Sequence, residues 1–313
     1  MTDLLIIDPQ AEEYAAHLKP RFPEVSIHTA GSGAGAGDLL GEAEVIAIIG
    51  PRLMEEDVRK APKLQWIQAL TVGVDNILQF SSLGEDVLIT TARGIHGPQM
   101  SELAVLLMLS LSRNFPRVVR NQGRRAWERW PQPLLEGRAV GILGVGVVGE
   151  AVARKCKAFG MTVAGITSTP REIGAFDRFY TRGELPRAAG EVDFLVVTVP
   201  HSPETDKIVG AEVLSAMKPT GFLINLARGG VVDEEALIDA LRSGGIAGAG
   251  LDVFNEEPLP GEHPLWEMEN VIITPHIGGM SENYIEQVLP ILEENLHHFV
   301  NGDRRSMINI VKR

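Results

Sequence analysis

The stretch Ala139-Val-Gly-Ile-Leu-Gly144-Val-Gly146-Val-Val-Gly149-Glu-Ala-Val-Ala153 decides the fold. It carries the pattern G-x-G-x-x-G directly after an apolar strand-like run and at the start of a segment with helical periodicity. In this pattern the first glycine makes the tight turn, the second lets a pyrophosphate approach the backbone, and the third lets the helix lie close to the strand. Free N–H groups at the helix start then hold the phosphates. The stretch therefore predicts a dinucleotide-binding unit whose cofactor contacts include Gly144, Val145, Gly146, Val147, Val148 and Gly149.

The end of the next predicted strand indicates which nicotinamide cofactor is bound. A ribose 2′-hydroxyl is held by an acidic residue about 20 residues after the glycine loop, and that position falls at Thr167. No Asp or Glu occurs from Gly160 until Glu172; hydroxyls and one guanidinium stand there instead, on Thr167, Ser168, Thr169 and Arg171. A guanidinium suits a 2′-phosphate, so the sequence favours NADP(H). The alternative is NAD bound without an acidic clamp.

Short apolar runs alternate with amphipathic segments on both sides of the loop, which indicates parallel sheets covered by helices. We expect strands at 4–7, 25–28, 45–49, 64–69 and 87–90, and a second series at 140–143, 162–166, 194–199, 222–226, 248–253 and 271–274. One long helix is expected at 98–119 with Leu103, Leu106, Leu107 and Leu111 as its apolar face, then a crossing segment at 120–137. The last helix, 281–300, is expected to pack on the N-terminal domain. The glycine-rich piece 31–37 imitates a phosphate loop but is interpreted as a flexible surface turn.

Length and composition limit the class of protein. The 313 residues suggest two domains, and the charge balance of 29 − 41 = −12 argues against a nucleic-acid partner. The single cysteine, Cys156, excludes a disulfide framework and a Cys-based zinc site, and we expect it to be a core thiol. The N-terminus lacks a signal-peptide pattern, and no apolar stretch reaches the roughly 20 residues that span a bilayer. We expect a cytoplasmic protein with no membrane partner.

Three later segments each carry an ionisable residue where a predicted strand ends. They are Leu223-Ile-Asn-Leu-Ala-Arg228, Gly250-Leu-Asp252-Val-Phe-Asn-Glu-Glu257 and Ile273-Thr-Pro-His276. In an open parallel sheet, ligands bind outside the carboxyl ends of the strands. We therefore expect these side chains to face one crevice.

With these segments the chain resembles the D-isomer-specific 2-hydroxyacid dehydrogenase family, which includes glyoxylate/hydroxypyruvate reductases. The likeness runs from Trp66-Ile-Gln-Ala-Leu-Thr-Val-Gly-Val-Asp-Asn76 through Ser101-Glu102, the glycine loop and Val199-Pro200-His-Ser-Pro-Glu-Thr205 to the three segments above. The resemblance implies an α/β fold of two Rossmann-like domains with parallel sheets, an active site in the interdomain cleft and a homodimer. A flavodoxin-like substrate-binding domain is expected at 1–99 plus 286–313, and the dinucleotide-binding domain at 100–285.

The resemblance also implies hydride transfer from NAD(P)H to a small 2-keto acid, giving the D-2-hydroxy acid. The planar fork of Arg228 suits the substrate carboxylate and carbonyl, and His276 can donate the proton. Glu257 is expected to hydrogen-bond the other ring nitrogen of His276. The resemblance adds further cofactor contacts, namely Val199, Pro200, Thr205, Ala227, Asp252 and Gly279, and substrate contacts, namely Leu53, Thr71, Val72 and Gly73. The substrate could be of the glyoxylate/hydroxypyruvate type or bulkier, because Arg52 suits a polar tail whereas Leu53 and Met54 suit an apolar one.

Several alternatives stay open. Glu256 is a rival for Glu257, but the Glu-Pro spacing favours Glu257. His201 is interpreted as a wall of the cofactor cleft and His96 as structural. No metal is expected, since no metal-ligand motif occurs and His297 and His298, being adjacent in a helix, do not face each other. Trp127, Trp130 and Trp266 could line the cleft, but we expect them to pack in the core or at a domain interface. A different class of protein, a cofactor-binding sensor of the co-repressor type with little catalysis, is the alternative function.

Overall fold

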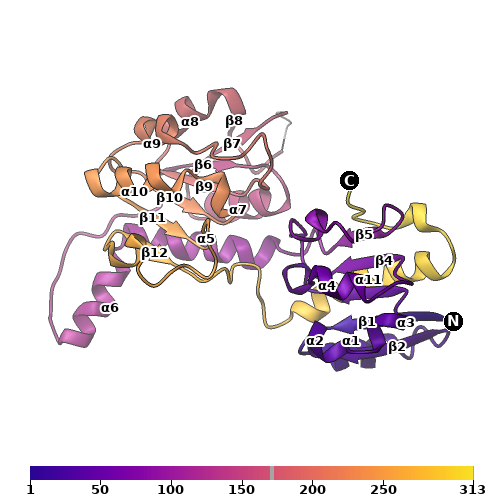
Figure 1. The fold of residues 1–313 in the computed structure, drawn as a ribbon. Helices are drawn as coiled ribbons and strands as arrows, with labels where there is room; N and C mark the ends of the chain where they lie inside the picture. Colours follow the sequence, from indigo (N-terminus) through magenta and orange to yellow (C-terminus); the bar gives the residue numbers. More distant parts are fainter. Residues whose placement is uncertain (170–172, 313) are drawn as a thin grey trace. The chain divides into compact units, whose positions relative to one another are not determined.

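The computed structural model describes residues 1–169 and 173–312 and divides into two compact units (Figure 1). Unit 1 comprises Met1–Ile95 together with the chain from Ser281 onward, and unit 2 comprises His96–Met280. Each unit contains one sheet in which every strand pair is parallel. The α/β class with two parallel-sheet domains is thereby confirmed.

Unit 1 has a five-stranded sheet in the order β2-β1-β3-β4-β5. The strands are β1 (Thr2–Ile7), β2 (Val25–Ala30), β3 (Val45–Ile48), β4 (Trp66–Ala69) and β5 (Leu88–Thr91). The helices are α1 (Ala11–Leu18), α2 (Gly33–Ala36), α3 (Leu39–Glu42), α4 (Glu55–Arg59) and α11 (Tyr284–Val300). The inner strands are almost wholly buried, as expected of a parallel sheet with helices on both faces.

The last helix packs on the N-terminal sheet, as the sequence predicts (Figure 1). Leu292, Leu296 and Phe299 of α11 share one apolar cluster with Leu4 and Trp66. A buried polar network fixes the same contact, because Asn295 donates to Gln68 Oε1 (2.9 Å), which also accepts from Thr90 (2.7 Å). Buried polar groups that are paired in this way specify one arrangement of helix and sheet.

Unit 2 has a seven-stranded sheet in the order β12-β11-β10-β9-β6-β7-β8. Its strands are β6 (Ala139–Leu143), β7 (Thr162–Thr167), β8 (Arg178–Thr181), β9 (Phe194–Val197), β10 (Phe222–Asn225), β11 (Gly248–Leu251) and β12 (Val271–Ile273). Its helices are α5 (Gly97–Ser112), α6 (Phe115–Arg124), α7 (Val147–Ala158), α8 (Leu185–Glu191), α9 (Ala211–Ala216) and α10 (Glu234–Ser243). Cys156 of α7 is buried, which confirms the expected core thiol, and burial raises its pKa to about 12.

The structure corrects several expectations about elements. The helix expected at 98–119 is two helices, α5 and α6, because Asn114 between them has a left-handed backbone (φ 50°). Leu106 is 58% exposed and so does not belong to the buried face of α5. The piece 31–37, interpreted as a flexible turn, contains α2, whose N-terminus is capped by Ser32. The strand β8 was missed.

The strands β9, β10 and β11 are one or two residues shorter at their carboxyl ends than the apolar runs from which they were predicted. Val199, Leu226 and Val253 lie beyond the strand ends but are still buried. An apolar run therefore indicates that its residues are buried, but not where the strand ends, because the buried residues continue into the loops at the carboxyl edge of the sheet. The site residues lie in these loops.

Trp127, Trp130 and Trp266 are not fully buried. Trp127 is 92% exposed and Trp266 is half-exposed, so core packing is wrong for both. Trp130 is partly buried and lies under the Arg117 guanidinium, 4.7 Å from the ring centroid.

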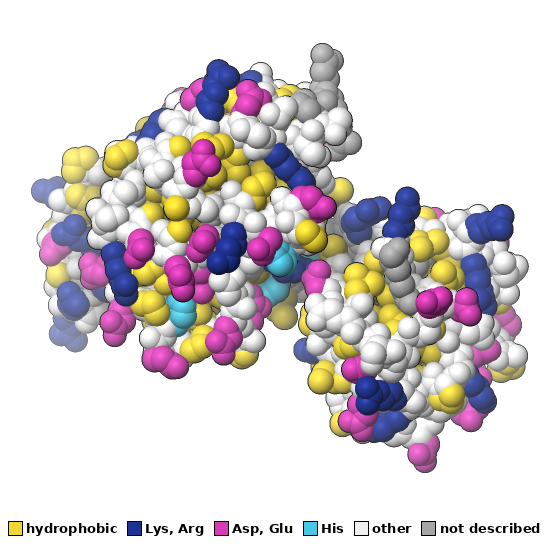
Figure 2. Space-filling view, turned by 45° about the horizontal axis from the view of Figure 1, so that its top comes forward, with side chains coloured by type: hydrophobic (Ala, Val, Ile, Leu, Met, Phe, Trp, Pro, Cys, Tyr) yellow, Lys and Arg dark blue, Asp and Glu magenta, His cyan; other side chains and the backbone are white. Residues whose placement is uncertain are grey.

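Acidic and basic side chains are interspersed over the face shown in Figure 2.

Candidate active site

The glycine loop lies between β6 and α7, as predicted. Gly144 has φ 107°, which favours glycine. A Cβ on Gly149 would lie 2.0 Å from the Gly144 carbonyl oxygen, so this close approach also requires glycine. A Cβ on Gly146 would meet nothing within 4 Å, and Gly146 is the N-cap residue of α7. The residues present thus fit a bound pyrophosphate, with open space beside Gly146 and a helix N-terminus behind it.

Thr198, after β9, supports the glycine loop from the neighbouring strand. Its hydroxyl donates to the carbonyl oxygens of Gly144 (2.9 Å) and Leu143 (3.2 Å). Sequence reasoning missed this residue. A hydroxyl residue directly after the buried run 194–197 is the signal that could have found it.

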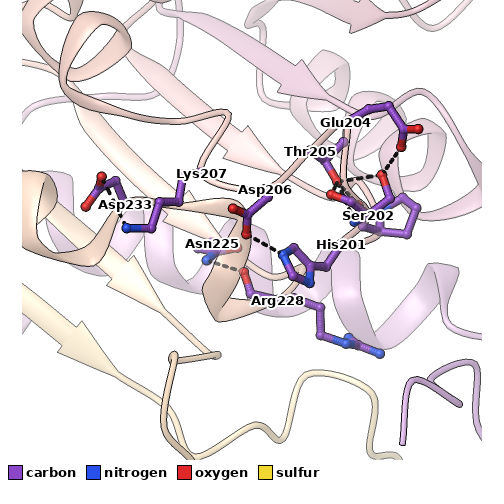
Figure 3. A network of polar contacts seen from close by, with 10 residues as sticks. His201, Ser202, Glu204, Thr205, Asp206, Lys207, Asn225, Arg228 and Asp233 are labelled. Atoms are coloured by element: carbon purple, nitrogen blue, oxygen red, sulfur yellow. Dashed lines mark hydrogen bonds and ion pairs between the residues drawn. The ribbon is translucent and has the colours of Figure 1, made fainter. Parts of the chain in front are cut away.

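Arg228 lies in the turn after β10, and Asn225 shapes that turn (Figure 3). The buried Asn225 side chain accepts from the Ala227 N–H (3.1 Å) and donates to the Arg228 carbonyl (3.1 Å). The partly buried Arg228 side chain donates one hydrogen bond back to the Ala227 carbonyl (2.7 Å). Figure 3 shows its guanidinium extending away from the nearby His201–Asp206 pair, whose Nε2 and Oδ1 atoms are 2.8 Å apart. Asn225 is a second residue that sequence reasoning missed.

His276 and Glu257 meet, as predicted. His276 Nδ1 and Glu257 Oε2 are 2.6 Å apart, with the side chains 45% and 34% exposed. The other Glu257 oxygen accepts from the Phe254 N–H (2.9 Å), which holds the carboxylate in place. Partial burial raises the pKa of Glu257, but hydrogen bonds from His276 and Phe254, with the charges of His276 and Arg228, outweigh it and hold this pKa below its ordinary value. Glu257 is therefore a carboxylate at neutral pH and places a negative charge beside the His276 ring.

Asp252 holds the turn that carries His276. The fully buried carboxylate accepts from the Thr274 hydroxyl (2.5 Å) and from the N–H groups of Ile277 (3.0 Å) and Gly278 (2.9 Å). His276 itself has a positive φ of 52° and donates its N–H to the Asp252 carbonyl (2.9 Å). A non-glycine residue in this region is strained and persists where its surroundings fix it. Asp252 thus positions His276, and its predicted contact with a cofactor stays a prediction.

His96, at the start of unit 2, lies near Arg228. Burial and then the charge of Arg228 lower its pKa to about 4, so this imidazole is neutral at physiological pH. A Cβ on Gly279 would lie 3.2 Å from the His96 ring, which places the predicted residue Gly279 against it. The interpretation of His96 as merely structural therefore understates its position. Its nearness to Arg228 was not visible in the sequence.

The remaining predicted cofactor residues have different surroundings. Thr205 is buried, and its hydroxyl donates to the Pro200 carbonyl (2.7 Å), closing the loop after β9. Val199, Ala227 and Val145 are buried, whereas Pro200 and Val147 are exposed and Val148 is intermediate. Thr167 is the last residue of β7, and Ser168 and Thr169 follow it on the surface. Arg171 lies outside the described residues.

The substrate contacts predicted in unit 1 are brought together at one sheet edge. Gly50 after β3 and Thr71 after β4 are joined, because the Gly50 N–H donates to the Thr71 hydroxyl (3.2 Å). Within residues 1–169 and 173–312 no hydrogen bond is found for the N–H groups of Val72 and Gly73. Such amides can take a carboxylate.

The prediction that Leu53 contacts the substrate is wrong. Its side chain is fully buried in the apolar core of unit 1, so it offers no surface to a substrate. Its neighbours are the exposed ones, Arg52 at 51% and Met54 at 62%. A strand end followed by Pro-Arg-Leu-Met does not reveal which of these side chains turns inward.

The described residues also bear on metal binding and membrane insertion. Among the described residues, no group of three or more His, Cys, Asp or Glu side chains could hold a metal ion. In the same part of the chain no helix combines the length and apolarity needed to cross a bilayer.

A glycine-loop Rossmann unit with a guanidinium and an imidazole–carboxylate pair at its strand ends defines an NAD(P)-binding oxidoreductase. Residues 105–278 match the model of the family described as D-isomer specific 2-hydroxyacid dehydrogenase, NAD binding domain. The chain belongs to the D-isomer specific 2-hydroxyacid dehydrogenase family.

Relatives and solved structures agree with this assignment. A glyoxylate reductase from Thermococcus onnurineus is 35% identical over 289 residues, covering 86% of this chain and 84% of that protein. A D-3-phosphoglycerate dehydrogenase from Methanocaldococcus jannaschii is 31% identical over 307 residues, but the chain spans only 58% of its length. A family member from Aeromonas salmonicida has a TM-score of 0.92 at 34% identity, covering 99% of both chains. An NADPH-dependent glyoxylate/hydroxypyruvate reductase from Sinorhizobium meliloti, solved with NADP and sulfate, has a TM-score of 0.85 at 27% identity, covering 100% of this chain and 98% of that one.

Proposed function

We propose that this chain reduces small 2-keto acids of the glyoxylate/hydroxypyruvate type to D-2-hydroxy acids and favours NADPH over NADH. The observation that carries the proposal is the 2.6 Å contact between His276 Nδ1 and Glu257 Oε2. This contact leaves the opposite ring nitrogen to act on a substrate. A carboxylate-oriented imidazole is a proton donor and acceptor near neutral pH.

Each residue has a role that follows from its chemistry. Arg228 binds the substrate carboxylate and carbonyl oxygen through two parallel hydrogen bonds. His276, protonated, donates its Nε2 proton to the carbonyl oxygen as negative charge develops there, and accepts it in the oxidation direction. Glu257 orients the ring and compensates its positive charge. Bound NADPH would supply the hydride that reaches the carbonyl carbon.

The cofactor is held by Gly144–Gly149 and by residues after β7. Gly146 leaves room for the pyrophosphate and Gly149 brings α7 close to the loop. The end of β7 offers Thr167, Ser168 and Thr169 where an acidic residue would favour NAD, and the Sinorhizobium meliloti relative contains NADP. NAD remains the second candidate.

Unit 1 is proposed to be the substrate-binding domain. On unit 1 the N–H groups of the turn at Thr71, Val72 and Gly73 would hold the substrate carboxylate. The substrate tail would meet the segment around the exposed Arg52 and Met54 rather than the buried Leu53.

The test is the loss of reduced-cofactor absorbance when glyoxylate, hydroxypyruvate, pyruvate or phenylpyruvate is added with NADPH or NADH. We expect turnover with at least the smaller keto acids and a higher kcat/KM with NADPH. Arg171→Ala should raise the KM for NADPH more than that for NADH. Cofactor binding without turnover of any keto acid would favour the sensor of the co-repressor type instead.

We further propose that the protein is a homodimer. Figure 1 shows α6 extending away from the sheet of unit 2, and no residue of α6 is buried. Its Phe115 and Val119 and the nearby Trp127 are all more than half exposed. Apolar side chains gathered on one projecting segment are typical of an interface, and light scattering should give the mass of two chains. Val119→Asp together with Trp127→Ser should give the mass of one.

A further inference from the structure

A second arginine lies at the carboxyl edge of the unit 2 sheet, one strand beyond the predicted ribose site. β7 and β8 are parallel, with Thr167 paired to Thr181 as the last pair of the ladder. Ser168 and Arg182 are therefore the first residues to leave the sheet, side by side, at the same edge. Arg182 begins a 3₁₀ turn (Arg182–Glu184), and Thr181 and Glu184 form a capping box that fixes this turn.

Arg182 differs from the other arginines of this corner in its partners. Arg178 pairs with Glu191 at 2.9 Å, and Arg187 pairs with Glu184 at 3.4 Å and with Glu191 at 3.1 Å. For Arg182 no carboxylate lies within ion-pair distance in the described part of the chain, and its buried Nε atom has no hydrogen-bond partner there. A buried donor left unpaired costs free energy, so this guanidinium is suited to an acceptor from outside the chain.

The surroundings indicate where such an acceptor would lie. In a Rossmann unit the pyrophosphate lies over the glycine loop after the first strand and the adenosine ribose lies at the end of the second. In this sheet these strands are β6 and β7, and β8 is next in the same direction. The exposed Glu204, in the loop after β9, is near enough for the charge of Arg182 to contribute to its lowered pKa, after hydrogen bonds from Ser202 and its own backbone. The end of β8 is therefore the next position beside a ribose bound at the end of β7.

We propose that Arg182 is a cofactor-specificity residue that binds the 2′-phosphate of NADPH from the end of β8. The assignment rests on the proposed use of NADPH. Arg182 supplies charge-assisted hydrogen bonds that the 2′-hydroxyl of NADH would not match. A structural interpretation is that Arg182 only compensates the charge of Glu204.

Binding of two probes separates these roles, namely adenosine 2′,5′-bisphosphate and adenosine 5′-monophosphate, titrated calorimetrically into the full-length protein. We expect Arg182→Ala to weaken the bisphosphate by roughly 10- to 100-fold, the usual range for one charge-assisted contact, and to leave the monophosphate within about threefold. Arg178→Ala is the matched control, since Arg178 is the first residue of β8, at the other end of the same strand, and already pairs with Glu191. Both probes should bind to it as to wild type. Thermal melting of each variant checks folding, and Arg182→Gln repeats the test with a side chain of similar length.

The outcomes are distinct. An equal loss for both probes, or none for the bisphosphate, overturns the assignment of Arg182 while leaving the proposed function intact. A wild-type protein that binds both probes equally well refutes the NADPH preference itself. In a Glu204→Gln background the effect of Arg182→Ala should persist; if it disappears, Arg182 acts only through Glu204 and the proposal fails.

Discussion

Replacing Glu257 with glutamine tests the role of the His276–Glu257 pair. Glutamine has the same shape and can still accept from the Phe254 N–H, now at 2.9 Å. It removes the negative charge that lies 2.6 Å from His276 Nδ1. With its oxygen on the Phe254 N–H, the glutamine turns its NH2 group toward His276 Nδ1, so the substitution keeps the shape of the side chain but removes both the charge and the acceptor that face the ring.

The magnitude follows from the geometry of the pair. A hydrogen bond between charged groups contributes about 1.5–3 kcal/mol. The side chains are 45% and 34% exposed, so solvent screening places this pair near the lower end, at about 1.5 kcal/mol. That corresponds to roughly a tenfold loss of kcat/KM for keto-acid reduction.

The assay is the initial rate of NADPH oxidation with glyoxylate, measured over a range of glyoxylate concentrations to give kcat/KM for each variant.

Glu256→Gln is the matched control. Glu256 is the exposed neighbouring carboxylate, and no contact with His276 is found for it within the described residues. Its replacement should leave kcat/KM at the wild-type value. A kcat/KM that is unchanged in Glu257→Gln, or that falls equally in both variants, would refute the reasoning.

Three further predictions concern catalysis, the glycine loop and acid stability. His276→Ala should lower turnover by roughly 10²–10⁴ while calorimetric cofactor affinity stays near wild type; unchanged turnover would remove His276 from its role. Gly149→Ala should lower both Tm and cofactor affinity, since its Cβ would lie 2.0 Å from the Gly144 carbonyl oxygen, whereas Gly146→Ala, in open space, should lower affinity alone. Asp193 is partly buried, which raises its pKa, but a backbone N–H and a lysine outweigh this and hold the pKa low. It therefore stabilises the fold above about pH 4, and the Tm deficit of Asp193→Asn should shrink as the pH falls below that value; a constant deficit would contradict this.

Much of the fold was predictable because the hydrophobic pattern of a parallel sheet is local. Each buried strand is a short apolar run, and the spacing of the glycines in the loop is enough to predict a tight turn between a strand and a helix. The break at Asn114 has two local signals, because Asn tolerates left-handed backbone and Pro116 stands in the first turn of α6. The expectation of one helix followed the apolar pattern, which continues across them. The strand β8 was missed because Arg-Phe-Tyr-Thr at its edge position is short and half polar.

The candidate site was predictable to the extent that it depends on residue type at a strand end. His276 and Glu257 were found in this way, and they meet. Asn225 closes a local turn through hydrogen bonds with Ala227 and Arg228, and its residue type alone does not reveal this. His96 depends on a tertiary contact, because its ring is buried near Arg228. Leu53 was misplaced for the same reason, because whether a side chain at a loop faces inward depends on the elements packed against it.

The order of the strands explains how the site can serve a long cofactor and a small acid together. Arg228, Asp252 and His276 follow β10, β11 and β12, which are neighbours at one side of the sheet. The glycine loop follows β6, and β7 and β8 complete the other side. Parallel strands lie about 4.8 Å apart, so their carboxyl ends form a row of positions, with proton chemistry at one end and phosphate-binding charge at the other. A dinucleotide extended along that row would bring its reactive ring toward His276 while its adenosine ribose lies at the end of β7. Arg182, at the end of β8, is next in the row, where we propose that it meets a 2′-phosphate.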